Sequence, residues 1–279
     1  MSKFTFRFGA TVALNAPANS PFPVLTSDLY QSTRQLAALG FDTIEYHIRD
    51  PKNEIDPVKL KQCAVDNGLD VSSLGTGMAY GAEGLSLISP DESIRKKAIQ
   101  RLKEHVDAAV ILGAYVVIGS MRGMIEPGQS FEEADALMVE GMRELAAYAE
   151  QRNVTFVIEA IDRFETNYIR TAQEDLALID RIGSKNVAVH LDSFHMNIEE
   201  RSWDAPIRLC GDKLKHVHLS DNMRNYPGYG HIPFEIVLRT LKEIGYKDSV
   251  TLEHYPYPDS ETSLREGLRF VKAIAEKLD

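Results

Sequence analysis

Cysteine is scarce in this sequence and basic residues are outnumbered by acidic ones, and each of these features argues against a class of protein. Only two of the 279 residues are cysteines, Cys63 and Cys210, and they form no ligand-spacing motif, so we expect free thiols in a reducing cytoplasm. Acidic residues outnumber basic ones by 41 to 31, which gives a formal net charge of -10. Because a net-acidic surface repels phosphate backbones and anionic lipids, we expect neither nucleic acid nor a membrane as a partner.

Long apolar segments and linkers are also missing. The longest apolar run, residues 108–119, is too short to span a bilayer. The first residues, MSKFTFRFGATVAL, lack the pattern of a secretory signal peptide. No stretch rich in Ser, Gly or Pro divides the chain. We therefore expect a single cytoplasmic domain over residues 1–279, in which 44% hydrophobic residues supply the core.

What recurs is a short β-branched segment, then a loop, then an amphipathic stretch, which is typical of βαβ units around a parallel sheet. The predicted strands are Phe6–Leu14, Thr43–Ile48, Asp70–Thr76, Tyr115–Ser120, Thr155–Ile161, Val187–Ser193, Leu214–Ser220 and Ser249–Tyr255. The predicted helices are Thr26–Leu39, Pro57–Asn67, Glu92–Leu112, Phe131–Gln151, Ala172–Ile182, Asp204–Asp212, Pro233–Ile244 and Glu261–Leu278. Eight such units in one undivided chain favour a closed α/β barrel, the (β/α)8 or TIM barrel, over an open sheet.

The last four predicted strands each carry an ionisable residue near the carboxyl end, where TIM barrels place their active sites. An apolar residue precedes each one, so strand alternation can turn the ionisable side chain into the barrel. A single Glu or His at a strand end is more often structural, but four at equivalent depth would be costly without a compensating cation. Three carboxylates and one imidazole suit Mn²⁺, Co²⁺ or Mg²⁺, and Zn²⁺ less specifically. The four residues are Glu159, Asp192, His218 and Glu253.

Three motifs in the same region resemble the ketose 3-epimerases related to D-tagatose 3-epimerase, within the xylose-isomerase-like barrel superfamily. They are Glu159–Glu165 (EAIDRFE), Leu191–Glu200 (LDSFHMNIEE) and His216–His218 (HVH). The resemblance covers nearly the whole chain, and the LDSFHMN block is quite specific. Further segments resemble one branch, the 5-keto-L-gluconate epimerases; these are Arg49–Pro51, Gly75–Tyr80, Gly84–Leu87 and Arg122–Gly123.

The resemblance implies that the four strand-end residues hold one divalent ion, with Mn²⁺ as first choice. It implies that Glu159 and Glu253 are the acid and base that invert the carbon next to a ketone, through a metal-stabilised enediolate. His195 and Arg224 stand where the family contacts the carbonyl oxygen, and Glu165 matches a carboxylate that supports the site. His216 shares a strand face with His218, and we expect it behind the ligands or in the core.

Two arginines bear on the substrate. Arg49 follows the second predicted strand and Arg122 the fourth, so both are expected at the catalytic rim, where a guanidinium can bind a carboxylate in a bidentate fork. With the resemblance, this favours a keto-sugar acid such as 5-keto-gluconate or tagaturonate, ahead of a sugar phosphate or a free ketose. In the alternative interpretation, either arginine pairs with Asp50 or Glu126.

The segments 76–89 and 120–130 follow strand ends and are long for the loops of such a barrel. We expect them to cover the substrate, with Met78, Tyr80 and Met124 excluding water. Ordinary packing loops are the alternative.

Other functions fit the same scaffold. An aldose–ketose isomerase of the hydroxypyruvate type or an inosose dehydratase would share the metal and the proton abstraction. An apurinic endonuclease needs more histidine ligands and a basic face, which 8 histidines and a charge of -10 argue against. A non-catalytic sugar-binding barrel would not need two opposed carboxylates. The sequence sets no oligomeric state, and a homo-oligomer is compatible with it.

Overall fold

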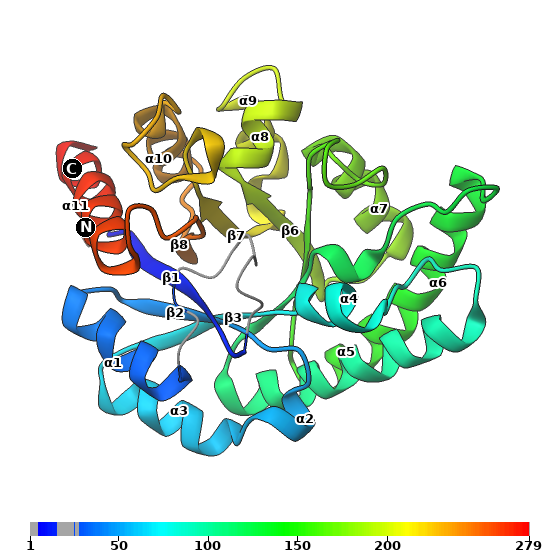
Figure 1. Cartoon of the computed structure of the whole chain (residues 1–279). Coiled ribbons are helices and arrows are strands. Elements are labelled where there is room, and N and C mark those ends of the chain that lie inside the picture. Colours follow the sequence, from blue (N-terminus) through cyan, green and yellow to red (C-terminus); the bar gives the residue numbers. More distant parts are fainter. Residues whose placement is uncertain (1–4, 16–24, 26–27, 279) are drawn as a thin grey trace.

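Eight parallel strands form a closed barrel in which each strand pairs with the next one along the chain and β8 pairs with β1 (Figure 1). The computed structural model describes residues 5–15, 25 and 28–278. The predicted TIM barrel is confirmed. The strands are β1 (Arg7–Ala13), β2 (Thr43–His47), β3 (Asp70–Gly75), β4 (Tyr115–Ile118), β5 (Phe156–Glu159), β6 (Val187–Asp192), β7 (Leu214–Leu219) and β8 (Ser249–Leu252).

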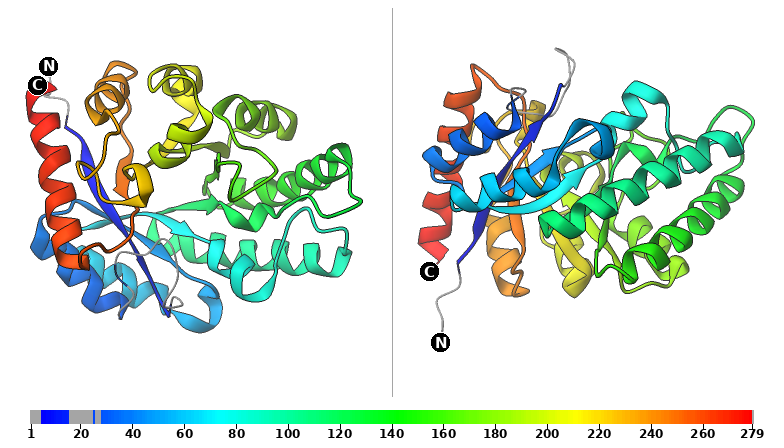
Figure 2. Two further views of the ribbon diagram at one scale, coloured as in Figure 1. Left: turned by 45° about the horizontal axis from the view of Figure 1, so that its top comes forward. Right: turned by 90° about the horizontal axis from the view of Figure 1, so that it is seen from below.

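Helices surround the barrel, and α11, at the end of the chain, lies beside β1 at its start (Figure 2). The longer connections contain α1 (Leu29–Leu39), α3 (Pro57–Asp66), α5 (Glu92–Leu112), α6 (Phe131–Glu150), α7 (Ala172–Ile182), α9 (Ala205–Cys210), α10 (Phe234–Glu243) and α11 (Ser260–Leu278). Short helices that the sequence did not predict are α2 (Pro51–Glu54), α4 (Gly77–Glu83), α8 (Ser193–Glu199), η1 (Ser120–Arg122) and η3 (Asn222–Arg224), whereas η2 (Gly211–Lys213) overlaps the end of the predicted helix 204–212.

Local capping explains where several helices begin and end. α5 has the predicted bounds because the Asp91 side chain accepts a hydrogen bond from the Ser93 amide and Gly113 closes the last turn at φ 74°. α6 begins with a capping box formed by Ser130 and Glu133. The first predicted helix began at Thr26, which lies outside the described residues, and α1 begins after Asp28. These caps fix the helices against the outside of the barrel.

The predicted strands extend too far at several carboxyl ends. Ser193, for example, was assigned to the sixth strand but is the first residue of α8, because the Asp192 side chain caps that helix by accepting a hydrogen bond from the Phe194 amide at 2.7 Å. The predicted helix 204–212 is likewise shorter, since α9 ends at Cys210 and η2 follows. The unpredicted short helices α4, α8, η1 and η3 all lie directly after strands, at one end of the barrel.

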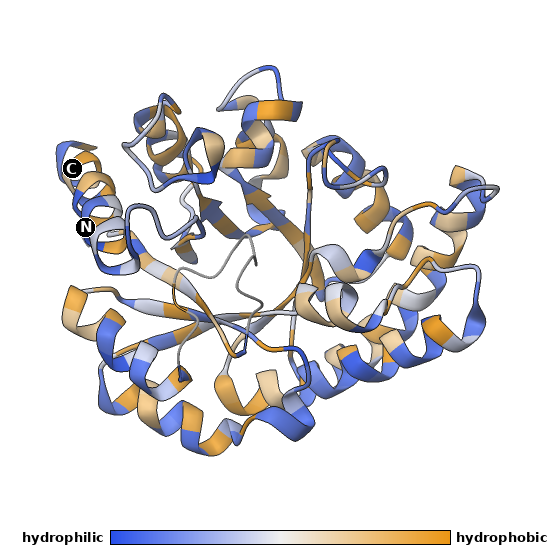
Figure 3. Ribbon diagram, in the orientation of Figure 1, coloured by the Kyte–Doolittle hydropathy of each residue, from blue (hydrophilic) through white to orange (hydrophobic). Residues whose placement is uncertain are grey.

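The apolar core lies between the barrel and its helices. Leu36, Phe156 and Val189 are among the side chains that are fully buried there. Figure 3 shows hydrophobic residues on the strands and on the inner faces of the helices, with hydrophilic residues on the outer faces. No helix in the described part of the chain is both long and apolar enough to cross a membrane.

Candidate active site and metal centre

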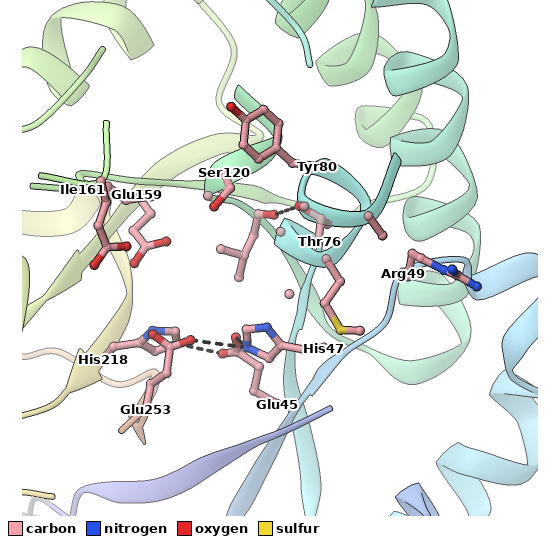
Figure 4. Close-up of a pocket in the computed structure, with 18 of the residues that line it drawn as sticks. Glu45, His47, Arg49, Thr76, Tyr80, Ser120, Glu159, Ile161, His218 and Glu253 are labelled. Carbon is pink, nitrogen blue, oxygen red and sulfur yellow. Dashed lines mark hydrogen bonds and ion pairs between the residues drawn. The ribbon is translucent and has the colours of Figure 1, made fainter. Parts of the chain in front are cut away.

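A cavity of about 570 Å³ opens among the carboxyl ends of the strands. Side chains from several strands and from the short helix α4 point into it (Figure 4). Its charged and imidazole-bearing lining residues are Glu45, His47, Arg49, Glu54, Glu159, Glu165, His195, His218, Arg224 and Glu253.

The structure brings the four predicted ligands together. One donor atom from each lies within 4.8 Å of the others, and all four residues are buried. They reach this point because β5, β6, β7 and β8 are consecutive neighbours in the barrel and each residue stands within one position of its strand's last residue. The residues are Glu159, Asp192, His218 and Glu253.

The donor set fits a divalent cation. Asp192 Oδ2 and His218 Nδ1 are buried, and neither has a well-directed hydrogen bond among the described residues, although Nδ1 lies 3.2 Å from Glu253 Oε2. Arg224 is the nearest cation, with Nη2 2.5 Å from Glu253 Oε2 and Nη1 3.1 Å from Asp192 Oδ2. One guanidinium does not balance three carboxylates, and oxygen ligands with one imidazole are a set that binds Mn²⁺, Mg²⁺ or Co²⁺.

Electrostatics distinguishes the two glutamates of this set. Burial raises the pKa of Glu159, an effect that His195 opposes and Glu253 reinforces. Burial also acts to raise the pKa of Glu253, but His218 and Arg224 outweigh it and hold that pKa below its usual range. Environments that separate two carboxylates in this way are typical of acid–base pairs.

His195 and Arg224 lie beside the four predicted ligands, and their contact with a substrate carbonyl oxygen stays a prediction. His195 Nδ1 is 2.6 Å from Asp162 Oδ2, and its Nε2 points into the site, 3.6 Å from Glu159 Oε1. Burial lowers the pKa of His195, but the hydrogen bond to Asp162 and the negative charges of Asp192 and Glu159 together outweigh burial and raise it. Sequence reasoning missed Asp162, although it lies within the EAIDRFE motif. Asp162 fixes the orientation of the His195 ring.

Two residues of β2 also belong to this site and were missed. Glu45 is fully buried, and its Oε2 lies 2.6 Å from His216 Nε2 and 2.9 Å from His218 Nε2. His47 Nε2 lies 2.9 Å from Glu45 Oε1 and 3.5 Å from Glu253 Oε1. A Cβ on Gly75 would lie 2.5 Å from His47 Nδ1, so the glycine makes room for the ring. The i, i+2 spacing of Glu45 and His47 on a predicted strand was the signal that could have found them.

Glu165 and Tyr80 both line the cavity. The segments 76–89 and 120–130 pack against each other, since the Leu87 amide donates to Met121 O at 3.0 Å and Gln129 Nε2 donates to Ile88 O at 2.7 Å. These contacts make one unit of the two segments. Their role in covering a substrate stays a prediction.

The structure does not support a substrate-binding role for Arg122. Its side chain is 1% exposed, and its guanidinium donates to four backbone carbonyl groups. The N–H donors of Arg122 therefore already join the end of β4 to the end of β5 and the segment after it. They are not available to a substrate in the main cavity. The four carbonyl groups belong to Gly119, Glu159, Tyr168 and Ile169.

We expect Arg122→Met to destabilise the protein, because it leaves these buried carbonyl groups without donors. A loss of at least about 3 kcal/mol follows from the usual penalty for unsatisfied buried groups, which corresponds to roughly 6 °C or more in Tm. Thermal unfolding checks this, with Arg49→Met as the half-exposed control that should change stability by under about 1 kcal/mol. An Arg122→Met variant with normal Tm but reduced turnover would return Arg122 to the substrate site.

Arg49 lines the cavity but is already paired. Its Nε donates to Glu54 Oε1 at 2.9 Å, and it lies 3.8 Å from Glu83 Oε1. Figure 4 shows its guanidinium pointing away from the carboxylates at the ends of β5 and β8. The alternative partners expected from the sequence, Asp50 and Glu126, are not the ones it contacts here.

Comparisons with known proteins identify the family of this chain. The family model described as the xylose isomerase-like TIM barrel matches residues 33–274. A D-psicose 3-epimerase from Ruminiclostridium cellulolyticum is 36% identical over 233 residues, which cover 79% of this chain and 76% of the relative. The chain belongs to the ketose 3-epimerases of this barrel family.

Further relatives support the same family. An L-ribulose 3-epimerase from a Methylomonas species is 32% identical over 222 residues, covering 78% of this chain and 76% of the relative. The crystal structure of D-psicose 3-epimerase with D-tagatose from Clostridium cellulolyticum H10 matches with a TM-score of 0.82 at 27% identity, over 97% of this chain and 99% of that one. The protein is thus an enzyme that acts on carbohydrates, and its relatives support a sugar epimerase.

Proposed function

We propose that the protein epimerises a ketose at the carbon next to its carbonyl group, using one divalent ion held by the four strand-end residues. Mn²⁺ is our first choice; Co²⁺ and Mg²⁺ suit the same donors, and Zn²⁺ suits them less specifically. The observation that carries the proposal is the convergence of three buried carboxylates and one imidazole within 4.8 Å at the wall of a sugar-sized cavity.

The side chains around the ion perform the proton transfers. When bound, the ion supplies Lewis-acid stabilisation of the negative charge that develops on the substrate oxygens. Glu159 and Glu253 come from strands separated by two others, so one takes the proton from one face of the substrate and the other returns a proton to the opposite face. In this proposal, His195 Nε2 and the Arg224 guanidinium donate to the carbonyl oxygen.

The charges of the cavity favour a neutral sugar. Five glutamates and two arginines line it, and both arginines are already paired with carboxylates. A substrate carboxylate would meet this excess of glutamates, and Arg49 could receive it only after leaving Glu54. A free ketose is therefore our first choice here, whereas the sequence alone favoured a keto-sugar acid. Arg49, at the cavity wall and partly exposed, keeps the keto-sugar acid as the second candidate.

We expect Arg49→Ala to change kcat/KM for a neutral ketohexose such as D-psicose or D-tagatose by less than about threefold, because the ion pair it loses is a partly exposed one. If the second candidate were correct, kcat/KM for 5-keto-gluconate would exceed that for the ketohexose in the unaltered protein, and Arg49→Ala would abolish this preference. Steady-state kinetics with both substrates decides between them.

Proton exchange in D₂O tests the reaction itself. Deuterium should enter only at the stereogenic carbon next to the carbonyl carbon, not at the terminal CH₂OH carbon. The epimer should form, and no aldose. Formation of an aldose would identify an aldose–ketose isomerase, and loss of water from an inosose would identify a dehydratase. A purified sample with no bound or bindable divalent ion would contradict the proposed function as a whole.

A further inference from the structure

The two ring nitrogens of His218 have different surroundings. Nδ1 faces the proposed metal centre, 3.2 Å from Glu253 Oε2 and 3.9 Å from Asp192 Oδ2. Nε2 faces the opposite way and lies 2.9 Å from Glu45 Oε2 and 3.0 Å from His216 Nε2, which itself lies 2.6 Å from the same carboxylate oxygen. A neutral imidazole has one protonated nitrogen and one with a free lone pair, so the group beside Nε2 decides which nitrogen can bind a metal.

Glu45 is held firmly in the middle of the barrel. It comes from β2, and its side chain is completely buried. The same Oε2 that faces His218 also accepts from Ser73 Oγ at 2.6 Å and lies 2.6 Å from His216 Nε2. Figure 4 shows Glu45 beside His47, across from His218 and Glu253. A buried carboxylate is costly unless it is paired, so its place among these donors is a fixed feature of the interior.

The His218 ring is confined as well. His190 packs against it with the ring centroids 4.2 Å apart and the planes at 78°. The ring is therefore held by His190 on one side and by the hydrogen bond to Glu45 at its Nε2 edge. Both contacts keep Nδ1 directed at the carboxylates of the centre.

We propose that Glu45 is a positioning residue for the metal centre, which accepts the Nε2–H of His218 and so keeps the Nδ1 lone pair available to the ion. This rests on the proposed metal site. A carboxylate behind a ligating histidine fixes the tautomer and ring orientation and raises the basicity of the ligating nitrogen. Glu45 does not touch the ion or the substrate in this role.

The test is the affinity for Mn²⁺, measured by titration with MnCl₂ and detection of free Mn²⁺ by electron paramagnetic resonance. Glu45→Gln keeps the shape but loses the charge, and Glu45→Asp keeps the charge but withdraws it from His218. Each is expected to raise the Kd about 10–100-fold, as removal of such a group usually does. Ser73→Ala is the matched control, because it removes a hydrogen bond to the same oxygen and leaves the contact with His218; its Kd should stay within about twofold.

A Kd within about twofold of the unaltered protein in both Glu45 variants would overturn the inference, as would an equal loss in Ser73→Ala. If neither Glu45 variant folds, ¹⁵N-histidine spectra of the unaltered Zn²⁺-loaded protein decide, with His218 assigned by His218→Gln. A proton on Nε2 is expected, and a proton on Nδ1 would refute the role. Absence of Mn²⁺ binding by the unaltered protein would instead contradict the proposed function.

Discussion

Glu159→Gln and Glu253→Gln are each expected to lower turnover at least about 100-fold, the usual scale for loss of a general acid or base. Glutamine has the size of glutamate but neither accepts nor returns a proton at the pH of the assay. The two residues lie in one cluster with their donor atoms within 4.8 Å, so the loss of either interrupts the same reaction. The effect should appear in kcat for epimer formation and in the rate of deuterium exchange.

Both residues are also proposed metal ligands, so the metal content of each variant must be measured under the assay conditions. Excess Mn²⁺ separates the two roles, because it restores occupancy but not proton transfer. Glu140→Gln, on the exposed face of α6, is the matched control and should behave like the unaltered protein. A metal-loaded Glu253→Gln with normal turnover would remove Glu253 from the proposed chemistry.

The cluster of four proposed ligands could be predicted from the sequence because the barrel imposes simple rules. Strand alternation turns every second side chain inward, and the parallel strands all end on one side. A polar residue at the end of each of four consecutive strands must therefore meet the others. The same rules placed the strands, and they failed at residues such as Ser193, which begins α8 because Asp192, the last residue of β6, caps that helix.

Other parts of the site depend on contacts between distant segments. In the sequence, Glu45 is an ordinary residue of a predicted strand. Only closure of the barrel brings it from β2 to His216 of β7, which lies 171 positions away in the sequence. Arg122 follows β4 as predicted, but η1 turns it back to carbonyl groups near the ends of β5 and its following loop. The sequence does not show which buried carbonyl groups lack donors, so it could not distinguish a structural arginine from a substrate-binding one.

Asp192→Asn is expected to weaken Mn²⁺ binding by about 100-fold or more, because removing a group that only orients a ligand already costs about 10–100-fold. The fold should survive this change. Oδ1 of Asp192 accepts from the Phe194 amide to cap α8, and asparagine caps helices as well as aspartate does. At the position of Oδ2, which faces the proposed metal centre, asparagine carries no negative charge.

Metal content after gel filtration and Mn²⁺ titration measure the effect, and thermal unfolding without added metal should show a Tm within about 2 °C of the unaltered protein. Asp91→Asn is the matched control, since Asp91 caps α5 in the same way but lies away from the cavity. It should keep full metal affinity. Because both variants exchange a capping aspartate for asparagine, a difference in Mn²⁺ affinity between them isolates the effect of the negative charge at Asp192 Oδ2. Full metal content with normal turnover in Asp192→Asn would show that Asp192 is not a ligand.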